Sequence, residues 1–272
     1  VYNGGRSEEI LGRLLAPVRD EVVIATKCGL PVGSGPIEHG TSAYHVRAAV
    51  EARLGRLGTE RIDLLFLHRV GTRPSMEETL TALDRMVTAG KVLYVGVSNW
   101  AAWQIATALG TAASLGTVAP VAVQPMYNLA KRQAEVEILP LAEHADLAVF
   151  PYSPLGGGLF TGRYTSATAD AEGRIASDPR YRTRYASPSN FSAASEVADV
   201  AEEAGVHPVT LAMAWVAGHP GVTAPLIGAR TAKQVEPALA AADFDLEPSL
   251  RDLLSALTPT PPPAHDRNEE QR

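Results

Sequence analysis

The apolar positions of the chain alternate between short β-branched runs and longer segments in which apolar residues recur at helical spacing. This alternation is typical of βα units that build a parallel sheet. The six predicted strands cover residues 21–28, 62–68, 92–99, 118–124, 147–153 and 224–229. Most of them are nearly continuous apolar runs, as expected for parallel strands that are covered on both faces.

Helices are predicted between these strands, at 7–16, 43–58, 75–90, 101–114, 132–145, 191–206 and 207–219. Ser75 with Glu77 and Glu78 is a helix start signal, and Gly90 is a stop signal. The Gly-, Ser- and Arg-rich stretch between about residues 154 and 191 is predicted to be a long loop, which in compact domains is usually functional or mobile. Residues 1–258 are predicted to form a single domain, followed by a proline-rich and then charged tail at 259–272 that we expect to be disordered.

Such a strand and helix order fits either an open doubly wound sheet or an eight-stranded barrel. No G-x-G-x-x-G motif follows the first strand, so the dinucleotide fingerprint of the open sheet is absent. A barrel keeps its active site at the carboxyl ends of its strands. Polar residues stand at each of these ends: Lys27, His68, Ser98 with Asn99, Gln124, Tyr152 with Ser153, and Gly228 to Arg230.

Each of these residues also has a purely structural explanation. Lys27 could be a strand terminus that extends its ammonium group to solvent, and His68 could be a core histidine. Ser98 and Asn99 could cap the next helix, and Gln124 could be a loop amide. A structural explanation of all six strand ends requires six independent coincidences, so their convergence on one rim of a barrel favours a functional site.

Composition narrows the function classes. With 46% hydrophobic and 20% charged residues the chain is a globular protein, and its net charge of −6 argues against nucleic acid as a partner. No apolar run is long enough to span a membrane, and the first residues do not form a signal peptide. The single cysteine, Cys28, excludes an internal disulfide and fits the cytoplasm. Abundant arginine and alanine indicate a GC-rich bacterial genome, whereas the oligomeric state cannot be read from the sequence.

Seven segments resemble the aldo-keto reductases, in the family's order and at family-like spacing: VYNGGRSEEILG, VIATKCG, LLFLHR, VGVSNW, VQPMYNL, YSPLGGGLFTGRY and LIGARTAKQVEPAL. The resemblance extends to about residue 243. It implies an α/β fold, the (β/α)8 TIM barrel, with a nicotinamide cofactor bound in an extended conformation. It also implies reduction of an aldehyde or ketone to an alcohol.

The resemblance assigns the catalytic residues as Tyr2, Lys27 and His68. Hydride transfer to a carbonyl carbon leaves negative charge on the oxygen, which requires a proton donor and electrostatic help. By resemblance Tyr2 donates the proton, Lys27 lowers the pKa of the tyrosine because an ammonium favours the phenolate, and His68 orients the carbonyl oxygen. The chemistry requires no metal, and the sequence offers no metal ligand set.

The resemblance also assigns the residues that hold the cofactor. Ser98, Asn99 and Gln124 would bind the nicotinamide carboxamide, and Tyr152 would stack on the nicotinamide ring. The loop that follows, with Ser153, Leu155 and Gly157, would bring backbone amides to the pyrophosphate because glycines remove the steric barrier. A merely flexible glycine-rich loop is the alternative.

Gly228, Arg230 and Gln234 lie in the segment GARTAKQ (228–234), which precedes a further helix. A helix N-terminus favours anions, and Arg230 with Gln234 could hold a ribose 2′-phosphate, so NADPH is favoured over NADH. The chain departs from the family pattern at Pro237 and Ala238, where the family usually has Glu-Asn to hold the adenine.

A second departure concerns the first residues. The family's catalytic aspartate lies five residues before its tyrosine, a position that this chain does not include. We therefore expect the chain to lack the first strands and the first helix of the barrel.

Two other functions stay open from the sequence. A nicotinamide-binding regulatory subunit with little turnover could keep the same residues, although no added interaction domain is seen. A cofactor-independent barrel hydrolase or isomerase is the third alternative. The identity of the aldehyde or ketone cannot be read from the sequence.

Overall fold

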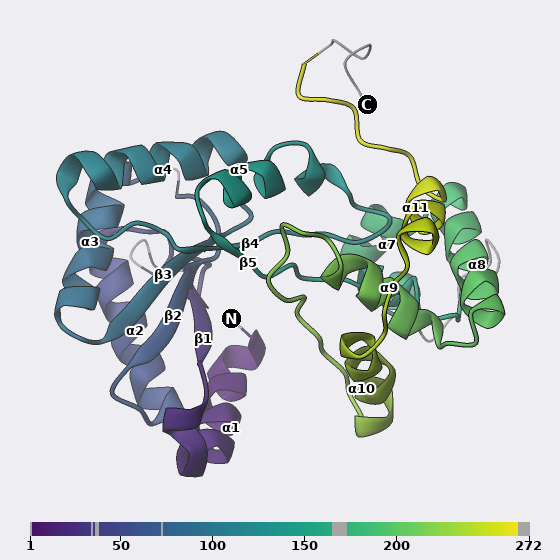
Figure 1. The fold of residues 1–272 in the computed structure, drawn as a ribbon. Helices are drawn as coiled ribbons and strands as arrows, with labels where there is room; N and C mark the ends of the chain where they lie inside the picture. The colour runs from purple at the N-terminus through teal and green to yellow at the C-terminus, as the bar shows by residue number, and fades with distance from the viewer. Residues whose placement is uncertain (1, 34, 36–37, 72, 165–172, 266–272) are drawn as a thin grey trace. The chain divides into compact units, whose positions relative to one another are not determined.

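The protein is described by a computed structural model that covers residues 2–33, 35, 38–71, 73–164 and 173–265. The chain divides into two compact units, Val1–Gln124 and Pro125–Arg272. Each unit has its own helices and strands (Figure 1).

The first unit is built on a parallel sheet in which the strands follow one another in chain order. The strands are β1 (Ala25–Cys28), β2 (Ile62–Leu67), β3 (Val92–Ser98) and β4 (Ala122–Gln124). Lys27 pairs with Phe66, and Ser98 pairs with Gln124. This register aligns the carboxyl ends of the strands at one edge of the sheet.

Helices alternate with these strands, as the sequence pattern predicts. They are the 3-10 helix η1 (Tyr2–Gly5), α1 (Arg6–Leu15), η2 (Ala16–Glu21), α2 (Ala43–Leu57), α3 (Met76–Thr88) and α4 (Ala102–Leu115). Consecutive helices from α1 to α4 pack beside one another (Figure 1). Ser42 and Ser75 cap α2 and α3 by accepting the backbone N–H groups of His45 and Glu78.

Two strands of the first unit are much shorter than predicted. The strand predicted at 21–28 begins only at Ala25, because the 3-10 helix η2, with Pro17 in its first turn, occupies the chain as far as Glu21. The strand predicted at 118–124 is reduced to Ala122–Gln124. Pro120 has no N–H group to donate to a neighbouring strand, so the ladder cannot extend through it.

The second unit is mainly helical. Its elements are η3 (Gln133–Glu135), α5 (Ile138–His144), β5 (Ala148–Val149), η4 (Gly156–Gly158), α6 (Arg174–Ser177), α7 (Pro179–Tyr185), α8 (Pro188–Glu203), α9 (Pro208–Ala217), α10 (Ala232–Leu239), η5 (Ala240–Ala242) and α11 (Pro248–Ala256). The helix predicted at 132–145 is divided into η3 and α5. Helices α8 and α9 confirm the predictions at 191–206 and 207–219.

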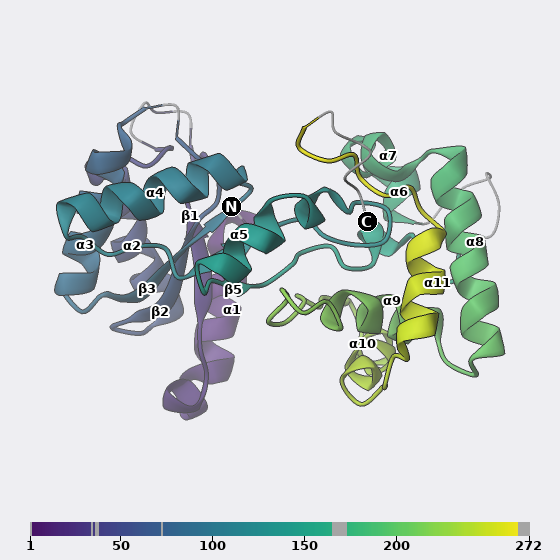
Figure 2. The same cartoon turned by 45° about the horizontal axis from the view of Figure 1, so that its top comes forward.

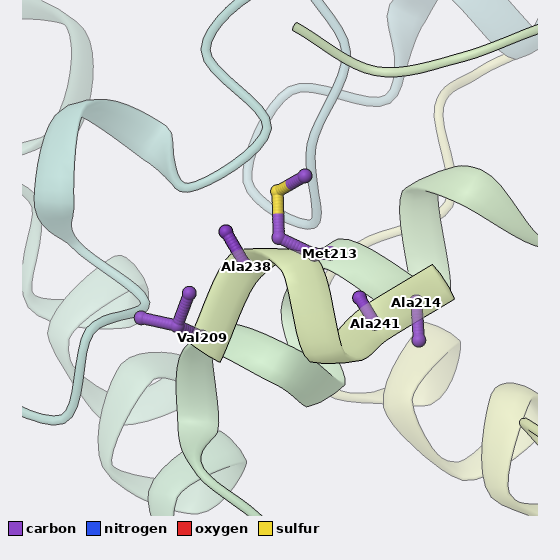
Figure 3. Close-up of a cluster of buried hydrophobic side chains, with 5 residues drawn as sticks. All are labelled: Val209, Met213, Ala214, Ala238 and Ala241. Carbon is purple, nitrogen blue, oxygen red and sulfur yellow. The ribbon is translucent and has the colours of Figure 1, made fainter. Parts of the chain in front are cut away.

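Helix α9 is the centre of this unit. It packs against α8, α10 and η5, and Figure 2 shows α8 and α10 together with α11. Arg251 and Ser255 of α11 bond to the carbonyl oxygen and the indole N–H of Trp215, respectively. A small apolar cluster joins α9 to α10 and η5 (Figure 3). Its members are Val209, Met213, Ala214, Ala238 and Ala241.

The prediction of a strand at 224–229 is wrong, because the structure has no regular element there. Thr223, Ala224 and Leu226 donate backbone hydrogen bonds to Val149 and Pro151, which is a fragment of parallel pairing beside β5. Pro225 cannot donate, and β5 itself has only two residues where 147–153 was predicted, so no regular ladder forms.

The prediction of a long loop between about residues 154 and 191 is wrong in part, because this stretch contains two short helices, α6 and α7. Residues 165–172 of this stretch lie outside the described residues. The same is true of 266–272, so disorder of the tail at 259–272 stays a prediction. Among the residues that the structure describes, no helix is long and apolar enough to cross a membrane.

Candidate active site

The structure brings Tyr2, Lys27 and His68 together in the first unit. The Lys27 ammonium lies 5.3 Å from the centroid of the Tyr2 ring. The rings of Tyr2 and His68 are stacked, with centroids 6.1 Å apart. Tyr2 keeps 57% of its surface exposed, so its ring can be reached from solvent. A phenol, an ammonium and an imidazole thus form one cluster.

Tyr2 is held in place by the turn that follows it. Asn3, Gly4 and Gly5 adopt positive φ angles of 50°, 64° and 94°, a left-handed conformation that glycine adopts at little cost. This turn leads directly into α1, where Glu8 accepts hydrogen bonds from the Thr26 hydroxyl (2.5 Å) and the Arg56 guanidinium (2.6 Å). The glycines after Tyr2 therefore serve a sharp turn that is anchored to β1 and α2.

Lys27 is positioned by its strand and by Arg53, a residue that the sequence analysis did not select. The Arg53 Nε atom of α2 donates to the Lys27 carbonyl oxygen (2.8 Å), and its guanidinium lies 3.6 Å from the Glu8 carboxylate. Burial lowers the pKa of Lys27. The signal for Arg53 was its place on the buried face of α2, where a charged residue needs partners.

His68 follows β2 directly and is half-buried. Burial, together with the positive charges of Lys27 and Arg69, lowers its pKa from 6.5 to about 4. The imidazole is therefore neutral near pH 7, and it then has one nitrogen that donates and one that accepts a hydrogen bond. A neutral imidazole can donate to a carbonyl oxygen without giving up its proton.

Ser98, Asn99 and Gln124 form a second group at the same edge of the sheet. The Ser98 hydroxyl donates to the Gln124 carbonyl oxygen (2.9 Å). The Asn99 amide donates to the Ser98 hydroxyl and to the His68 carbonyl oxygen, both at 3.0 Å. Asn99 has a φ of 59°, an uncommon conformation that often marks functional positions.

The alternative helix-capping role of Ser98 and Asn99 is wrong. Helix α4 begins at Ala102 rather than at Trp100, and its N-cap is Ala101. The Gln104 side chain accepts the Ala101 backbone N–H at 2.9 Å. Gln124 is not a loop amide either, because it is a buried strand residue.

Tyr152 and Ser153 belong to the second unit and follow β5. The Tyr152 N–H donates to the Pro125 carbonyl oxygen, and its own carbonyl accepts the N–H of Tyr127. Ser153 has a positive φ of 57°, and its carbonyl oxygen accepts a bond from the buried Asn128 amide (2.8 Å). The backbone is thus fixed where the glycine-rich loop begins.

That loop forms the short helix η4, with Gly156, Gly157 and Gly158 all at positive φ. Gly156 and Gly158 donate their N–H groups to Ser153 and Leu155. Within the described part of the chain, the N–H groups of Leu155 and Gly157 have no acceptor. The Leu155 side chain packs against the α9–α10 cluster of Figure 3. The loop is therefore ordered by its neighbours and offers two backbone donors.

Gly228, Arg230 and Gln234 lie at the beginning of α10. The Gln234 side chain accepts the backbone N–H of Arg230 at 3.0 Å, closing the turn before the helix. Arg230 is exposed, and the surroundings of Gly228 are open. Pro237 lies inside α10, and its carbonyl oxygen accepts the Thr210 hydroxyl at 2.7 Å.

The predicted site residues form two groups, one in each unit. The first unit holds Tyr2, Lys27, His68, Ser98, Asn99 and Gln124, and the second holds Tyr152, Ser153, Leu155, Gly157, Gly228, Arg230 and Gln234. Across the described ranges, no cluster of three His, Cys, Asp or Glu residues could hold a metal ion.

Comparison with known proteins places this arrangement in a family. The model of the Aldo/keto reductase family matches residues 1–256. A probable voltage-gated potassium channel subunit beta of Arabidopsis thaliana is 34% identical over 89% of the chain and 76% of that protein. An uncharacterized oxidoreductase of Bacillus subtilis is 32% identical, with 95% and 79% covered. Human aflatoxin B1 aldehyde reductase member 2 is 33% identical, with 93% and 74% covered. The chain therefore belongs to the aldo/keto reductase family of (β/α)8 barrels, and the protein is an oxidoreductase that reduces carbonyl compounds with a nicotinamide cofactor.

Proposed function

We propose that the protein reduces a small aldehyde or ketone to the alcohol with NADPH and that Tyr2 donates the proton. The observation that carries this proposal is the cluster of Tyr2 with the Lys27 ammonium at 5.3 Å and the stacked His68 ring. An acid, a cation and a neutral hydrogen-bond donor are the groups that a carbonyl oxygen needs while negative charge develops on it.

When bound, the cofactor supplies the hydride. The residues of the chain orient the carbonyl oxygen of the substrate and donate a proton to it. The Lys27 ammonium favours the tyrosinate form and so eases proton release from the Tyr2 hydroxyl. His68 stays neutral near pH 7, so its N–H can orient the carbonyl oxygen while Tyr2 remains the acid. The low pKa of His68 makes an imidazolium a poor choice of proton donor in this site.

The residues of both units fit the cofactor. Ser98, Asn99 and Gln124 supply the donors and acceptors that a carboxamide requires, and Tyr152 supplies an aromatic face. In the second unit the N–H groups of Leu155 and Gly157 suit phosphate oxygens, and glycine permits their close approach. Both sets are polar groups of the kind that a dinucleotide requires.

The preference for NADPH over NADH is assigned to Arg230. Its side chain is exposed next to the N-terminus of α10, where a ribose 2′-phosphate would meet both a guanidinium and a favourable helix dipole. The Gln234 side chain already accepts the Arg230 N–H, so its contribution is to fix this turn. Gly228 leaves the approach to it open.

The test is turnover of the full-length protein with a panel of aldehydes and ketones, followed by cofactor absorbance. We expect oxidation of NADPH with at least one small carbonyl, and a lower Kd for NADPH than for NADH in a fluorescence titration. Tight binding of NADPH without turnover of any carbonyl would contradict the proposed reaction. Equal affinity for the two cofactors would contradict the role of Arg230.

A regulatory subunit is the second candidate function, because three of the similar proteins carry the name of voltage-gated potassium channel subunit beta. A stoichiometric partner in a pull-down, together with negligible carbonyl turnover, would favour it. We propose a cytoplasmic location for either function, since the sequence has a single cysteine, Cys28, and so does not depend on an internal disulfide.

A further inference from the structure

Helix α7 contacts one end of the loop Ser153–Gly157 directly and is linked to the other end through Asn128, although α7 comes more than twenty residues later in the chain. At the far end of the loop, the Tyr181 ring lies against Gly157. A β-carbon on Gly157 would overlap this ring, so the glycine and the tyrosine are in direct contact. Because Gly157 also has a φ of 70°, both its space and its backbone conformation suit glycine alone.

At the near end of the loop, Tyr185 acts through Asn128. The Asn128 amide donates to the Tyr185 hydroxyl (3.2 Å) and to the Ser153 carbonyl oxygen (2.8 Å). Tyr185 and Asn128 are both fully buried, and the Tyr185 hydroxyl also contacts the Met126 sulfur at 3.5 Å. This chain of bonds fixes the carbonyl of Ser153, a residue with an uncommon positive φ.

The two tyrosines are one helical turn apart and support each other. Their rings stack with centroids 6.3 Å apart. The guanidinium groups of Arg174 and Arg184 lie 5.2 and 5.7 Å from the centroid of the Tyr181 ring, within cation–π distance. Tyr181 is thus held from several sides while it rests on Gly157.

We propose that Tyr181 and Tyr185 are positioning residues that set the shape of the loop and thereby the affinity for the cofactor's pyrophosphate. This inference rests on the proposed function, in which the Leu155 and Gly157 N–H groups bind that pyrophosphate. A loop that is ordered before binding loses less conformational entropy when the ligand binds, so the ligand is bound more tightly. Loss of either contact frees one end of the loop and weakens binding.

The experiment compares Tyr181→Ala, Tyr181→Phe and Tyr185→Phe with the full-length wild-type protein, by fluorescence titration of NADPH and by steady-state kinetics. We expect Tyr181→Ala to raise the Kd for NADPH by about tenfold, because the ring that packs on Gly157 is lost. Tyr181→Phe keeps the ring and restores wild-type affinity. Tyr185→Phe removes only a hydroxyl and raises the Kd by about threefold.

A positioning role predicts a specific kinetic pattern. The KM for NADPH rises in Tyr181→Ala and Tyr185→Phe, whereas kcat at saturating NADPH and the KM for the carbonyl stay at the wild-type values. Tyr44→Ala is the matched control, since Tyr44 is an exposed tyrosine of α2 in the first unit, whereas the loop belongs to the second unit. It should leave both KM values unchanged.

The outcomes separate the inference from its premise. If the wild-type protein binds no NADPH, the proposed function fails and the inference fails with it. If the wild-type protein binds NADPH and the folded Tyr185→Phe and Tyr181→Ala proteins bind it equally well, only the positioning role is overturned. If Tyr181→Ala does not fold, Tyr185→Phe decides the question alone, because its ring fills the same space.

Discussion

Lys27, His68 and Ser98 lie at the ends of regular parallel strands, whereas Ser153, Leu155 and Gly157 lie in a loop that is held by tertiary contacts as well as by its own short-range hydrogen bonds. In the first unit the backbone hydrogen bonds between strands align the strand ends, so the sheet determines the positions of the side chains there. In the second unit Asn128, α7 and the α9–α10 cluster each hold one part of the loop. Lys27, His68 and Ser98 are therefore placed by secondary structure, and the backbone donors proposed for the pyrophosphate are placed by packing.

This comparison predicts that a change in the first group affects turnover and leaves binding intact. Tyr2→Phe removes the proposed acid but keeps the ring beside Lys27. We expect kcat to fall by about 10²- to 10⁴-fold, the usual contribution of a general acid, with the Kd for NADPH unchanged. Stopped-flow measurement of NADPH oxidation checks the first value, and fluorescence titration checks the second. A Tyr2→Phe protein with normal kcat would show that another group supplies the proton.

A change in the second group should act on cofactor choice. Arg230→Ala removes the guanidinium proposed for the 2′-phosphate, and a charge-assisted bond of this kind corresponds to about tenfold or more in affinity. The Kd for NADPH should rise accordingly and that for NADH should stay constant. Arg85→Ala is a suitable control because it removes an exposed arginine of α3, a helix of the first unit. An equal loss for both cofactors would remove Arg230 from the specificity site.

The glycine-rich loop allows a sharper comparison between two neighbouring glycines. Gly157 and Gly158 both have positive φ angles, 70° and 106°, so alanine is strained at either position. Only at Gly157 would the new β-carbon overlap the Tyr181 ring, whereas it meets open space at Gly158. Gly157→Ala should therefore lower the melting temperature and the NADPH affinity more than Gly158→Ala. Calorimetry measures the melting temperature and titration measures the NADPH affinity of both variants. Equal effects of the two substitutions would show that the contact between Tyr181 and Gly157 does not contribute.

The smallest predicted effect concerns His68 and pH. Its pKa falls from 6.5 to about 4 on folding, so the unfolded chain binds the proton more readily. The contribution of His68 to the free energy of unfolding is fully present above pH 6.5 and is lost as the pH falls through about 4. His68→Asn should flatten this part of the stability profile. An NMR titration that finds an ordinary His68 pKa would show that burial and Lys27 do not act as described.

Much of the candidate site could be predicted from the sequence. The apolar runs of β2 and β3 predict two central strands. Because the strands are parallel, His68, which comes directly after β2, and Ser98, the last residue of β3, are predicted to lie at the same edge of the sheet. Helices α2 and α3 were predicted almost to the residue, because Ser42, Ser75 and the glycines after them act locally. Local signals of this kind depend only on neighbours in the chain.

The predictions that failed depend on partners that are distant in the sequence. The segment at 224–229 has the apolar residues of a strand, but it does not form a regular ladder of backbone hydrogen bonds, because Pro225 interrupts the pairing and β5 is short. Helix α7 has the sequence PRYRTRY, which is rich in arginine and tyrosine and has no run of aliphatic residues at helical spacing, so no periodicity revealed it. Arg53 could not be recognised as the partner of Lys27 without the packing of α2 on β1.

The sequence by itself determined the family, the order of strands and helices, and the residue types that chemistry on a carbonyl requires. Its opening segment, Tyr2 followed by Asn3 and two glycines, also determined a turn, because few other residues tolerate positive φ. Only the tertiary structure decided that the ring of Tyr2 lies next to both Lys27 and His68, and that α7 contacts the glycine loop. Such contacts depend on packing between segments far apart in the chain, which no local pattern encodes.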